Sequence, residues 1–113
     1  MRILVVEDDP FVREMAVSGL EDDGFEVIAA ADGGQALSLL DTEIAIDALL
    51  TDIRMPEADG WEVAKAFRRR FPDLPVIYVT GYSERLDPVT GGVVLPKPYK
   101  LSQAISILRT WDT

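Results

Sequence analysis

Acidic side chains gather directly after two short apolar runs. Glu7, Asp8 and Asp9 follow residues 3–6, and Asp52 follows a second run of the same kind. Carboxylates that crowd together repel one another, so at least one of them has a raised pKa unless a cation joins the group. Mg²⁺ suits such a group, because it takes one or two carboxylates and keeps water molecules or phosphate oxygens as its other ligands. These acids therefore predict an open magnesium site.

Two further polar side chains follow later apolar runs. Thr80 comes after residues 75–79, and Lys97 comes shortly after residues 93–95. The ammonium group of Lys97 could balance the charge of a phosphoryl group, and the hydroxyl of Thr80 could donate a hydrogen bond to it. Together with a magnesium site, these two residues predict that the ligand is a phosphoryl group.

The composition removes most other chemistry. The chain has no cysteine and no histidine, so disulfides, thiol catalysis, Ser-His-Asp triads and thiolate or imidazole metal sites are excluded. Its 11 Lys and Arg residues stand against 20 Asp and Glu residues, which gives a formal net charge of −9. This charge repels a phosphate backbone, so we expect no direct contact with nucleic acid.

The length and the apolar content indicate one globular domain. The chain has 113 residues, of which 48% are hydrophobic and 27% are charged, a balance that fits neither a disordered tail nor a membrane protein. No apolar run approaches the roughly 20 residues that a membrane-spanning helix needs. The acids at positions 7–9 also come too early for a signal peptide. We expect a single domain over residues 1–113, located in the cytoplasm and without membrane contact.

Short apolar runs alternate with segments of helical periodicity, which indicates βαβ units and a parallel sheet. Asp9 and Asp32 have the side chain and position of helix N-caps, and for Asp9 that role explains the residue fully. After Asp9, helical spacing is seen for five residues: Val12, Met15, Ala16, Gly19 and Leu20. The predicted strands cover residues 3–6, 25–30, 47–51, 75–79 and 93–95, and the predicted helices cover residues 10–22, 32–40, 61–71 and 101–108.

This alternation explains why the polar residues would meet. In an open parallel sheet, ligands bind beyond the carboxyl ends of the strands, near the point where the strand order reverses. The acids, the threonine and the lysine all follow predicted strands at that end. We therefore expect them to line one edge of the sheet.

The segment 80–92 does not fit the pattern of a long amphipathic helix. It contains three glycines, one proline and only a few aliphatic residues. A crossover between parallel strands needs about a dozen residues, so the segment is just long enough to connect two strands. We expect a short or irregular fourth helix, with one or two helical turns near residues 83–87.

Four segments of the sequence together resemble the receiver domain of two-component response regulators. They read VVEDDP at 5–10, LTDIRMP at 50–56 with DG at 59–60, VTG at 79–81 and KPY at 97–99. The segments occur in the order of the family and span nearly the whole chain. The resemblance implies an α/β fold of the flavodoxin-like, doubly wound type, with a five-stranded parallel sheet in the order 2-1-3-4-5.

The resemblance also implies a phosphoacceptor and a metal ion. Asp52 would attack the phosphorus of a phosphohistidine on a histidine kinase or a histidine phosphotransfer protein. Mg²⁺ would be ligated directly by Asp8 and Asp52. Glu7 would reach the ion through water, and the backbone carbonyl of Arg54 would complete the protein's share of the ligands.

Thr80 and Lys97 would hold the phosphoryl oxygens in such a domain. The peptide bond between Lys97 and Pro98 would be cis, as in the family. The whole would act as a signalling switch rather than a metabolic enzyme, changing its contacts with a downstream protein target when phosphorylated.

Two features depart from most receivers. Many of them carry an aromatic residue three positions before the lysine, where this chain has Val94. Tyr82 or Tyr99 would then be the moving aromatic, and Arg54 together with Tyr82 would shield the phosphoryl group and prolong its lifetime. The distance from Thr80 to Lys97 is also several residues shorter than is usual in the family. The strings TGY at 80–82 and LPKPY at 95–99 resemble the receivers that occur alone or in hybrid histidine kinases.

Three alternatives share the same scaffold. A pseudo-receiver would bind proteins without phosphorylation, and it would normally lack one of the acids, the threonine or the lysine. A flavodoxin needs a loop rich in Ser, Thr and Gly after the first strand, where this chain has acids. A phosphatase of the haloacid type has a second aspartate two residues after the nucleophile, where this chain has Arg54.

Trp61 and Trp111 are interpreted as packing residues.

Overall fold

Strands and helices alternate along the chain, with small shifts from the predicted ends. The computed structural model describes residues 1–81 and 85–112. Within these residues the elements are β1 (Arg2–Val6), α1 (Pro10–Asp22), β2 (Glu26–Ala30), α2 (Gly33–Ser38), the 3₁₀-helix η1 (Leu39–Asp41), β3 (Ala48–Asp52), α3 (Gly60–Arg70), β4 (Val76–Thr80), β5 (Val93–Pro96) and α4 (Leu101–Trp111).

The strands form one sheet in the order β2-β1-β3-β4-β5. Every neighbouring pair of strands is parallel. The order reverses at β1, which lies between β2 and β3, so the carboxyl ends of β1 and β3 mark the topological switch point where such folds bind ligands. The predicted flavodoxin-like, doubly wound fold is confirmed.

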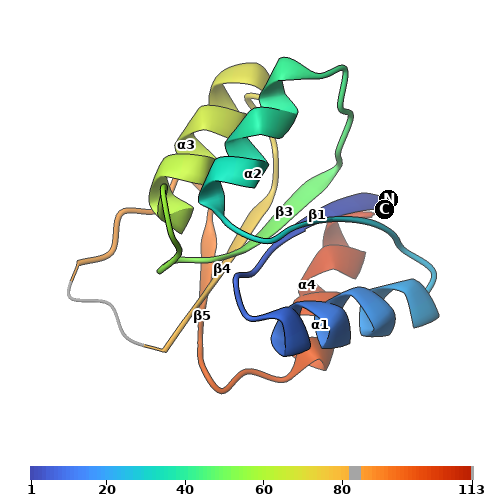
Figure 1. Ribbon diagram of the computed structural model, residues 1–113. Helices are drawn as coiled ribbons and strands as arrows, with labels where there is room; N and C mark the ends of the chain where they lie inside the picture. Colours follow the sequence, from blue (N-terminus) through green and yellow to red (C-terminus); the bar gives the residue numbers. More distant parts are fainter. Residues whose placement is uncertain (82–84, 113) are drawn as a thin grey trace.

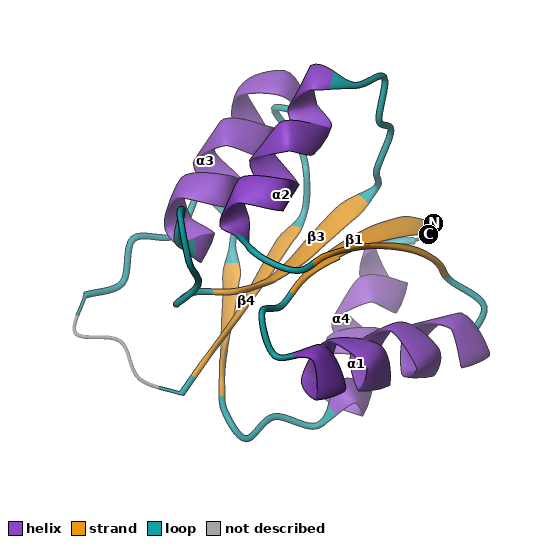
Figure 2. Cartoon of the chain, viewed as in Figure 1, coloured by secondary structure: helices purple, strands orange, loops and turns teal. Residues whose placement is uncertain are grey.

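Helices cover both faces of the sheet. In Figure 1, α2 and α3 lie on one face and α1 and α4 on the other, and Figure 2 shows the same three layers coloured by type of element. Leu4 and Val6 of β1 pack into the α2–α3 layer, whereas Ile3 and Val5 pack into the α1–α4 layer. A central strand that is buried on both faces requires the continuous apolar run seen in the sequence.

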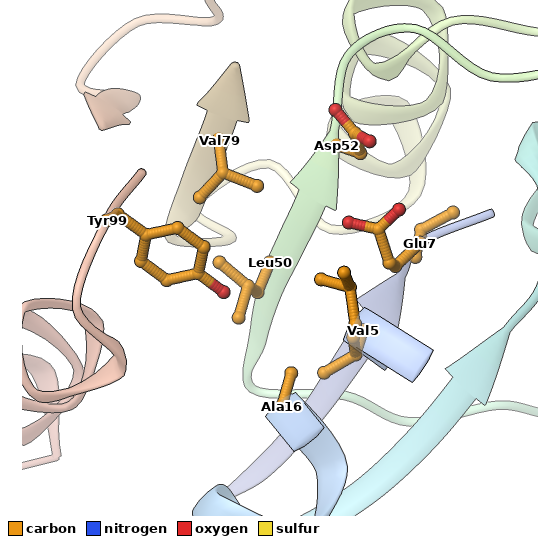
Figure 3. Close-up of a pocket in the computed structure, with 9 residues that line it drawn as sticks. Val5, Glu7, Ala16, Leu50, Asp52, Val79 and Tyr99 are labelled. Carbon is orange, nitrogen blue, oxygen red and sulfur yellow. The ribbon is translucent and has the colours of Figure 1, made fainter. Parts of the chain in front are cut away.

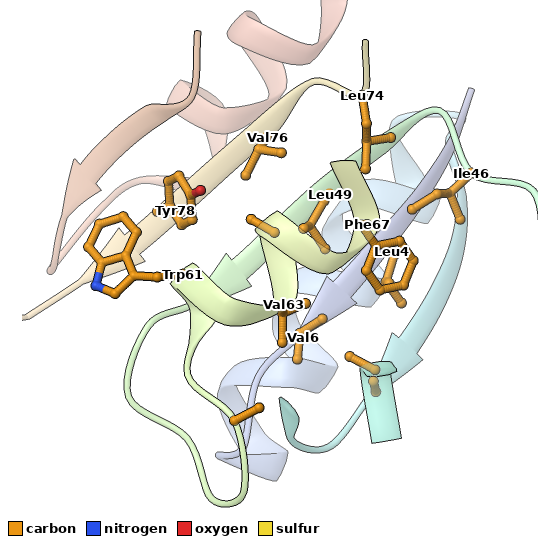
Figure 4. Close-up of a cluster of buried hydrophobic side chains, with 14 of the residues drawn as sticks. Leu4, Val6, Ile46, Leu49, Trp61, Val63, Phe67, Leu74, Val76 and Tyr78 are labelled. Atoms are coloured by element: carbon orange, nitrogen blue, oxygen red, sulfur yellow. The ribbon is translucent and has the colours of Figure 1, made fainter. Parts of the chain in front are cut away.

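The core between the sheet and α3 contains the largest side chains. Figure 4 shows Trp61, Val63 and Phe67 of α3 lying over Leu49 and other residues of the sheet. Phe67 is fully buried, which stabilises the fold by about 2 kcal/mol. Trp61 belongs to this core, and Trp111 packs half-buried in the α1–α4 layer, so both tryptophans are packing residues as predicted.

Aspartates begin three of the helices. The Asp9 carboxylate accepts hydrogen bonds from the backbone amides of Phe11 and Val12 at 2.9 and 3.2 Å. Asp32 caps α2 and Asp59 caps α3 in the same way. These contacts satisfy backbone N–H groups that have no partner inside the helix. Within the described part of the chain, none of the helices combines the length and apolar character needed to cross a bilayer.

The inward face of α1 is narrower than the sequence pattern predicts. Ala16 and Leu20 are buried, but the Met15 side chain is 59% exposed and Phe11 is 70% exposed. Residues 15 and 16 differ by about 100° around a helix axis, so a face centred on Ala16 and Leu20 leaves Met15 at its margin. Of the residues that recur at helical spacing, Met15 thus lies outside the buried face.

The connection between β4 and β5 contains no helix at residue 81 or at residues 85–92. The helical turns predicted near residues 83–87 fall partly on residues 82–84, which lie outside the described residues. Side chains of α3 hold the later part of the connection. Lys65 pairs with Asp87, and Arg68 donates a hydrogen bond to the carbonyl of Thr90 at 2.8 Å.

Candidate functional site

Three carboxylates meet at the carboxyl ends of β1 and β3. Glu7, Asp8 and Asp52 each place one oxygen within 4.8 Å of those of the other two. Glu7 and Asp52 are buried, with 4% and 8% of their surface exposed, while Asp8 is exposed to water. Asp52 is the last residue of β3, and Glu7 is the first residue after β1. The parallel pairing of these strands therefore brings the acids together.

Backbone contacts fix the orientation of Glu7. Its carboxylate accepts a hydrogen bond from the amide of Asp9 at 3.1 Å, and its own amide donates to the carbonyl of Ala30 at 3.2 Å. Arg13 of α1 donates to the Glu7 carbonyl at 2.9 Å. The loop that carries Glu7 and Asp8 is thus held by both β2 and α1.

Lys97 faces the buried acids from the far side of the site. Its Nζ lies 2.9 Å from Asp52 Oδ2 and 3.5 Å from Glu7 Oε1. The amide of Lys97 donates to the carbonyl of Thr80 at 2.7 Å, which extends the pairing of β4 and β5. The peptide bond between Lys97 and Pro98 is cis, as expected.

Burial and neighbouring charges shift the pKa of Glu7. Burial raises the pKa of this carboxyl from its usual value to about 7, and the charge of Asp52 adds to the effect. The hydrogen bond from the Asp9 amide and the charge of Lys97 act in the opposite direction. One carboxylate of the group thus has a raised pKa, as predicted, but the largest cause is burial and not repulsion between the carboxylates.

The pKa of Lys97 is also raised. Burial alone would lower it, but the hydrogen bond and the charge of Asp52, together with those of Glu7, outweigh burial. Lys97 therefore carries a positive charge at neutral pH, and this charge lies next to the carboxyl groups of Asp52 and Glu7.

The space beside the acids is small. Figure 3 shows the carboxylates of Glu7 and Asp52 above an apolar floor that includes Val5, Leu50 and the ring of Tyr99. The cavity measures about 10 Å³, which leaves room for about one water molecule. Its lining is mainly apolar, and Asp8 and Lys97 do not belong to it, so this cavity is not where we expect the ion or the phosphoryl group.

The structure gathers some predicted site residues more closely than others. Glu7, Asp8, Asp52 and Lys97 form one cluster. Thr80 ends β4 at the same edge of the sheet and is half-buried.

The other predicted residues lie outside this cluster of side chains or outside the described residues. The side chain of Arg54 is exposed. Tyr82, proposed as a shield and as a moving aromatic, lies outside the described residues. Tyr99 is half-buried beside the acids.

Sequence reasoning missed two residues with structural roles at this edge. Arg13 fixes the Glu7 carbonyl, and nothing in its spacing distinguishes it from an ordinary helix arginine. Tyr78 was assigned only to a strand, yet it is fully buried and hydrogen-bonded to the next connection. The sequence signal that could have indicated this role is a single tyrosine within a predicted strand whose neighbouring residues are aliphatic.

Comparison with known proteins decides the family. The family model of the response regulator receiver domain matches residues 3–107. The chain belongs to this family. It is thus the receiver domain of a response regulator in two-component signalling, a switch rather than a metabolic enzyme.

Similar receivers are known as sequences and as structures. Response regulator MprA of Mycobacterium avium is 39% identical over 114 residues, covering 96% of this chain and 50% of that protein. The receiver domain thus spans about half the length of the curated relatives it matches. A response regulator receiver protein from Sinorhizobium medicae has 31% identity and a TM-score of 0.92, covering 98% of this chain and 93% of the other.

A third relative has a structure with ligands. Response regulator protein TrrA from Thermotoga maritima, in complex with Mg(2+)-BeF, has 28% identity and a TM-score of 0.84, with 97% of each chain covered. The flavodoxin and haloacid-type phosphatase alternatives do not agree with membership of the receiver family.

Proposed function

We propose that Asp52 accepts a phosphoryl group from the phosphohistidine of a histidine kinase or a histidine phosphotransfer protein, in a Mg²⁺-dependent reaction. The phosphorylated domain then changes its contacts with a downstream protein. One observation carries this proposal: three acids with oxygens within 4.8 Å of one another face an amine 2.9 Å from Asp52 Oδ2. In two-component signalling, this cluster would be the site that receives the phosphoryl group.

The donor set fits Mg²⁺. All three groups are carboxylates, one of them open to water, and hard divalent ions prefer oxygen ligands with room for water. Asp8 and Asp52 would hold the ion directly, with Glu7 through water and the carbonyl of Arg54 completing the set. When bound, Mg²⁺ supplies positive charge that offsets the repulsion between the carboxylates and the incoming phosphoryl group.

The chain's own residues can perform the transfer. The Ile53 amide holds Asp52 Oδ1 at 2.7 Å, which orients the carboxylate with Oδ2 toward Lys97. An Asp52 oxygen forms the bond to phosphorus while the phosphorus–nitrogen bond breaks, and the bonding electrons leave with the imidazole nitrogen, which takes a proton from water. Lys97 and Thr80 then hold phosphoryl oxygens.

The surface next to the acids suits a protein donor. Phe11 and Met15 project from α1 with 70% and 59% exposure. A groove of about 190 Å³ runs from Met15 to Leu101 of α4, and Val12 and Ala16 line both this groove and the cavity at the acids. Because the groove shares lining residues with the cavity beside Asp52, we assign it to a helical segment of the phosphohistidine donor.

A phosphodonor assay tests the proposal. Incubation with acetyl phosphate and Mg²⁺, followed by measurement of the intact mass, should show one added phosphoryl group, and Asp52→Asn should show none. Asp9→Asn is the matched control, because Asn also caps helices well and Asp9 binds amides of α1. Labelling that survives in Asp52→Asn would refute the assignment.

The same assay addresses the pseudo-receiver alternative. A module that binds proteins without phosphorylation would take up no phosphoryl group under any of these conditions. The presence of all three acids, together with Thr80 and Lys97, favours the phosphorylated form of the switch.

A further inference from the structure

The second half of α3 carries a group of cations that the site at Asp52 does not use. The chain as a whole is acidic, with a formal net charge of −9 and only 11 Lys and Arg residues. Four of these cations nevertheless lie at positions 65, 68, 69 and 70 of this one helix. The end of α3 is thus a basic surface on an acidic protein.

Two of the arginines are held by partners that carry no charge. Arg68 donates hydrogen bonds to the carbonyls of Leu74 at 2.6 Å and Thr90 at 2.8 Å. Arg70 donates to the carbonyl of Leu40 at 2.8 Å. A backbone carbonyl fixes the place of a guanidinium group but has no formal charge. These contacts therefore orient the two arginines and leave their positive charges available to an anion.

Arg69 has no such structural role. Its side chain is exposed, and it makes no hydrogen bond or ion pair with any residue that the structure describes. Arg68 and Arg70 already complement the helix dipole at this end of α3. Lys65 lies four residues before Arg69 on the same face, a spacing at which like charges destabilise a helix. An anionic ligand beside Arg69 would offset this repulsion.

The cations border a shallow groove of about 490 Å³. Lys65, Arg68 and Arg69 line one side of it, and residues 88–90 line the other, together with Pro72. Figure 1 shows α3 beside the orange trace that contains residues 88–90. Among the described residues, no carboxylate belongs to this lining, although Asp87 pairs with Lys65 beside it. The groove is therefore positive along its α3 side.

The opposite side of the groove is apolar and its shape is fixed. Pro72, Pro88 and Val89 present mainly carbon atoms, and proline restricts the backbone at two of these positions. Arg68 spans the groove by its hydrogen bond to the Thr90 carbonyl. A groove that exists before its ligand arrives loses little conformational freedom on binding.

We propose that this groove binds an acidic, extended segment of a partner protein. Its Glu or Asp side chains contact Arg68 and Arg69, because carboxylates form paired hydrogen bonds with guanidinium groups. Its apolar side chains lie over Pro88 and Val89. Alternate residues of an extended chain point to opposite sides, so a segment in which acidic and apolar residues alternate meets both sides of the groove.

The charge of the whole chain favours a peptide over a nucleic acid. A formal net charge of −9 repels a phosphate backbone, which carries dense negative charge over a long distance. A short acidic segment carries few charges, and in the groove they lie well within a Debye length of about 8 Å from Arg68 and Arg69. The local attraction then exceeds the repulsion from the remainder of the chain.

The groove lies away from the phosphoacceptor. Gly60 at the start of α3 adjoins the Asp52 carbonyl, whereas Arg69 lies near the end of the helix, about 13 Å further along its axis. A segment bound beside Arg69 leaves the acids open to a phosphodonor. The groove can therefore hold its partner whether or not Asp52 carries a phosphoryl group.

An NMR titration with a defined peptide tests the inference. The probe is an end-blocked peptide of alternating glutamate and leucine, about six residues long. It is added to the nitrogen-labelled chain without Mg²⁺ or phosphodonor. Amide shifts should change at residues 65–71 and 89–90, and affinity should fall severalfold as the ionic strength rises from about 0.05 M to about 0.5 M. Arg69→Glu should weaken binding by about tenfold or more.

Matched controls separate the groove from the overall charge. Lys100→Glu makes the same change of charge at another exposed position, outside the groove, and should bind the peptide as the wild-type chain does. Arg69→Gln removes the charge without placing an acid at the end of α3. It should weaken binding less than Arg69→Glu, and it keeps the test valid if circular dichroism shows that Arg69→Glu disturbs the fold. A peptide with glutamine in place of glutamate should not bind.

Several outcomes would overturn the inference. One is equal weakening by Arg69→Glu and Lys100→Glu, which would mean that only the total charge matters. Another is an absence of shift changes at residues 65–71 and 89–90. An oligothymidylate that binds these residues more tightly than the peptide would replace the protein partner with a nucleic acid. Because neither Mg²⁺ nor a phosphodonor is present, none of these results bears on the proposed role of Asp52.

Discussion

Asp8 differs from the other two acids of the cluster because its side chain is exposed to water. Glu7 and Asp52 already have Lys97 as a neighbouring cation, whereas the exposed carboxylate of Asp8 gains most from a metal ion. An ion that binds only the folded chain stabilises it, by about 2.7 kcal/mol at a hundredfold excess over the dissociation constant. We therefore expect Mg²⁺ to raise the melting temperature of the wild-type chain, and Asp8→Asn to lose most of that rise.

Thermal unfolding at constant ionic strength, with and without Mg²⁺, measures this effect. Asp9→Asn serves as the control and should respond as the wild-type chain does. An equal Mg²⁺ response in Asp8→Asn would show that Asp8 is no ligand.

Tyr78 predicts how stability changes at alkaline pH. Burial raises the pKa of its hydroxyl above the ordinary value, although the hydrogen bond from Val89 opposes the shift. The folded chain thus holds this proton more tightly than the unfolded chain does. The stabilisation is complete below the unfolded pKa of about 10 and is lost as the pH rises through the folded value.

Urea unfolding at neutral and alkaline pH tests this sign. The free energy of unfolding should fall more steeply above pH of about 10 in the wild-type chain than in Tyr78→Phe. Tyrosinate absorbance should show Tyr78 ionising only as the chain unfolds. A Tyr78→Phe chain that loses stability as steeply as the wild type would contradict the prediction.

At the scale of elements, the start of α3 is the part most tightly joined to the site. The Gly60 amide donates to the Ile53 carbonyl at 2.8 Å, and a Cβ at Gly60 would come within 2.2 Å of the Asp52 carbonyl oxygen. Backbone atoms cannot rotate away as a side chain can. We expect Gly60→Ala to destabilise the fold by about 3 kcal/mol and to weaken phosphorylation by displacing Asp52.

Gly19→Ala provides the comparison for Gly60→Ala. Its Cβ would meet the terminal methyl Cδ2 of Leu101 at 2.2 Å, and that methyl can turn aside. The change in unfolding free energy should stay within about 1 kcal/mol, because alanine also favours the helix. Denaturant unfolding of both variants measures the difference, and similar losses in the two would refute the argument.

The strands were predictable because burial on both faces leaves a plain signal. Residues 3–6 and 48–50 are apolar without interruption, and both runs lie in central strands. The inward face of α1 was less predictable, since Met15 and Ala16 differ only in how far round the helix they lie. The course of residues 85–92 depends on contacts with Lys65, Arg68 and Tyr78. Such long-range contacts leave no periodic pattern in a sequence.

At the scale of the whole molecule, the gathering of the acids with Lys97 follows from topology alone. The carboxyl ends of parallel strands lie at one edge of the sheet, so knowing which polar residue follows each strand was enough to predict that these residues meet. This rule does not predict the contacts that orient their side chains. Arg13 reaches the Glu7 carbonyl from another element, and the direction of a long side chain depends on its packed surroundings. The roles of the individual site residues stay predictions until the phosphodonor assay.

The exposed apolar surface of α1 predicts a difference between two kinds of phosphodonor. Met15 borders the groove assigned to the donor protein, whereas acetyl phosphate needs only the acids and Lys97. The donor for this test is a phosphorylated histidine kinase that acts on the wild-type chain. With this donor, Met15→Glu should reduce the rate of transfer by about tenfold or more. Its rate with acetyl phosphate should be unchanged.

Phosphorylation rates with the two donors, measured in parallel, decide this point. Glu43→Lys changes charge at an exposed position remote in sequence from α1 and should leave both rates as they are. Equal slowing of Met15→Glu with both donors would indicate damage to the site instead of lost docking.

Glu7 and Lys97 meet across 90 positions of the sequence, one just after the first strand and the other just after the last. During translation, the acids leave the ribosome long before the amine that neutralises them. A nascent chain can complete the charge balance of the cluster only after β5 has been synthesised and has paired with β4. Under the proposed function, a signal therefore reaches only chains that have been synthesised at least through Lys97 and have folded that far, and fragments that end before β5 do not respond to the signal.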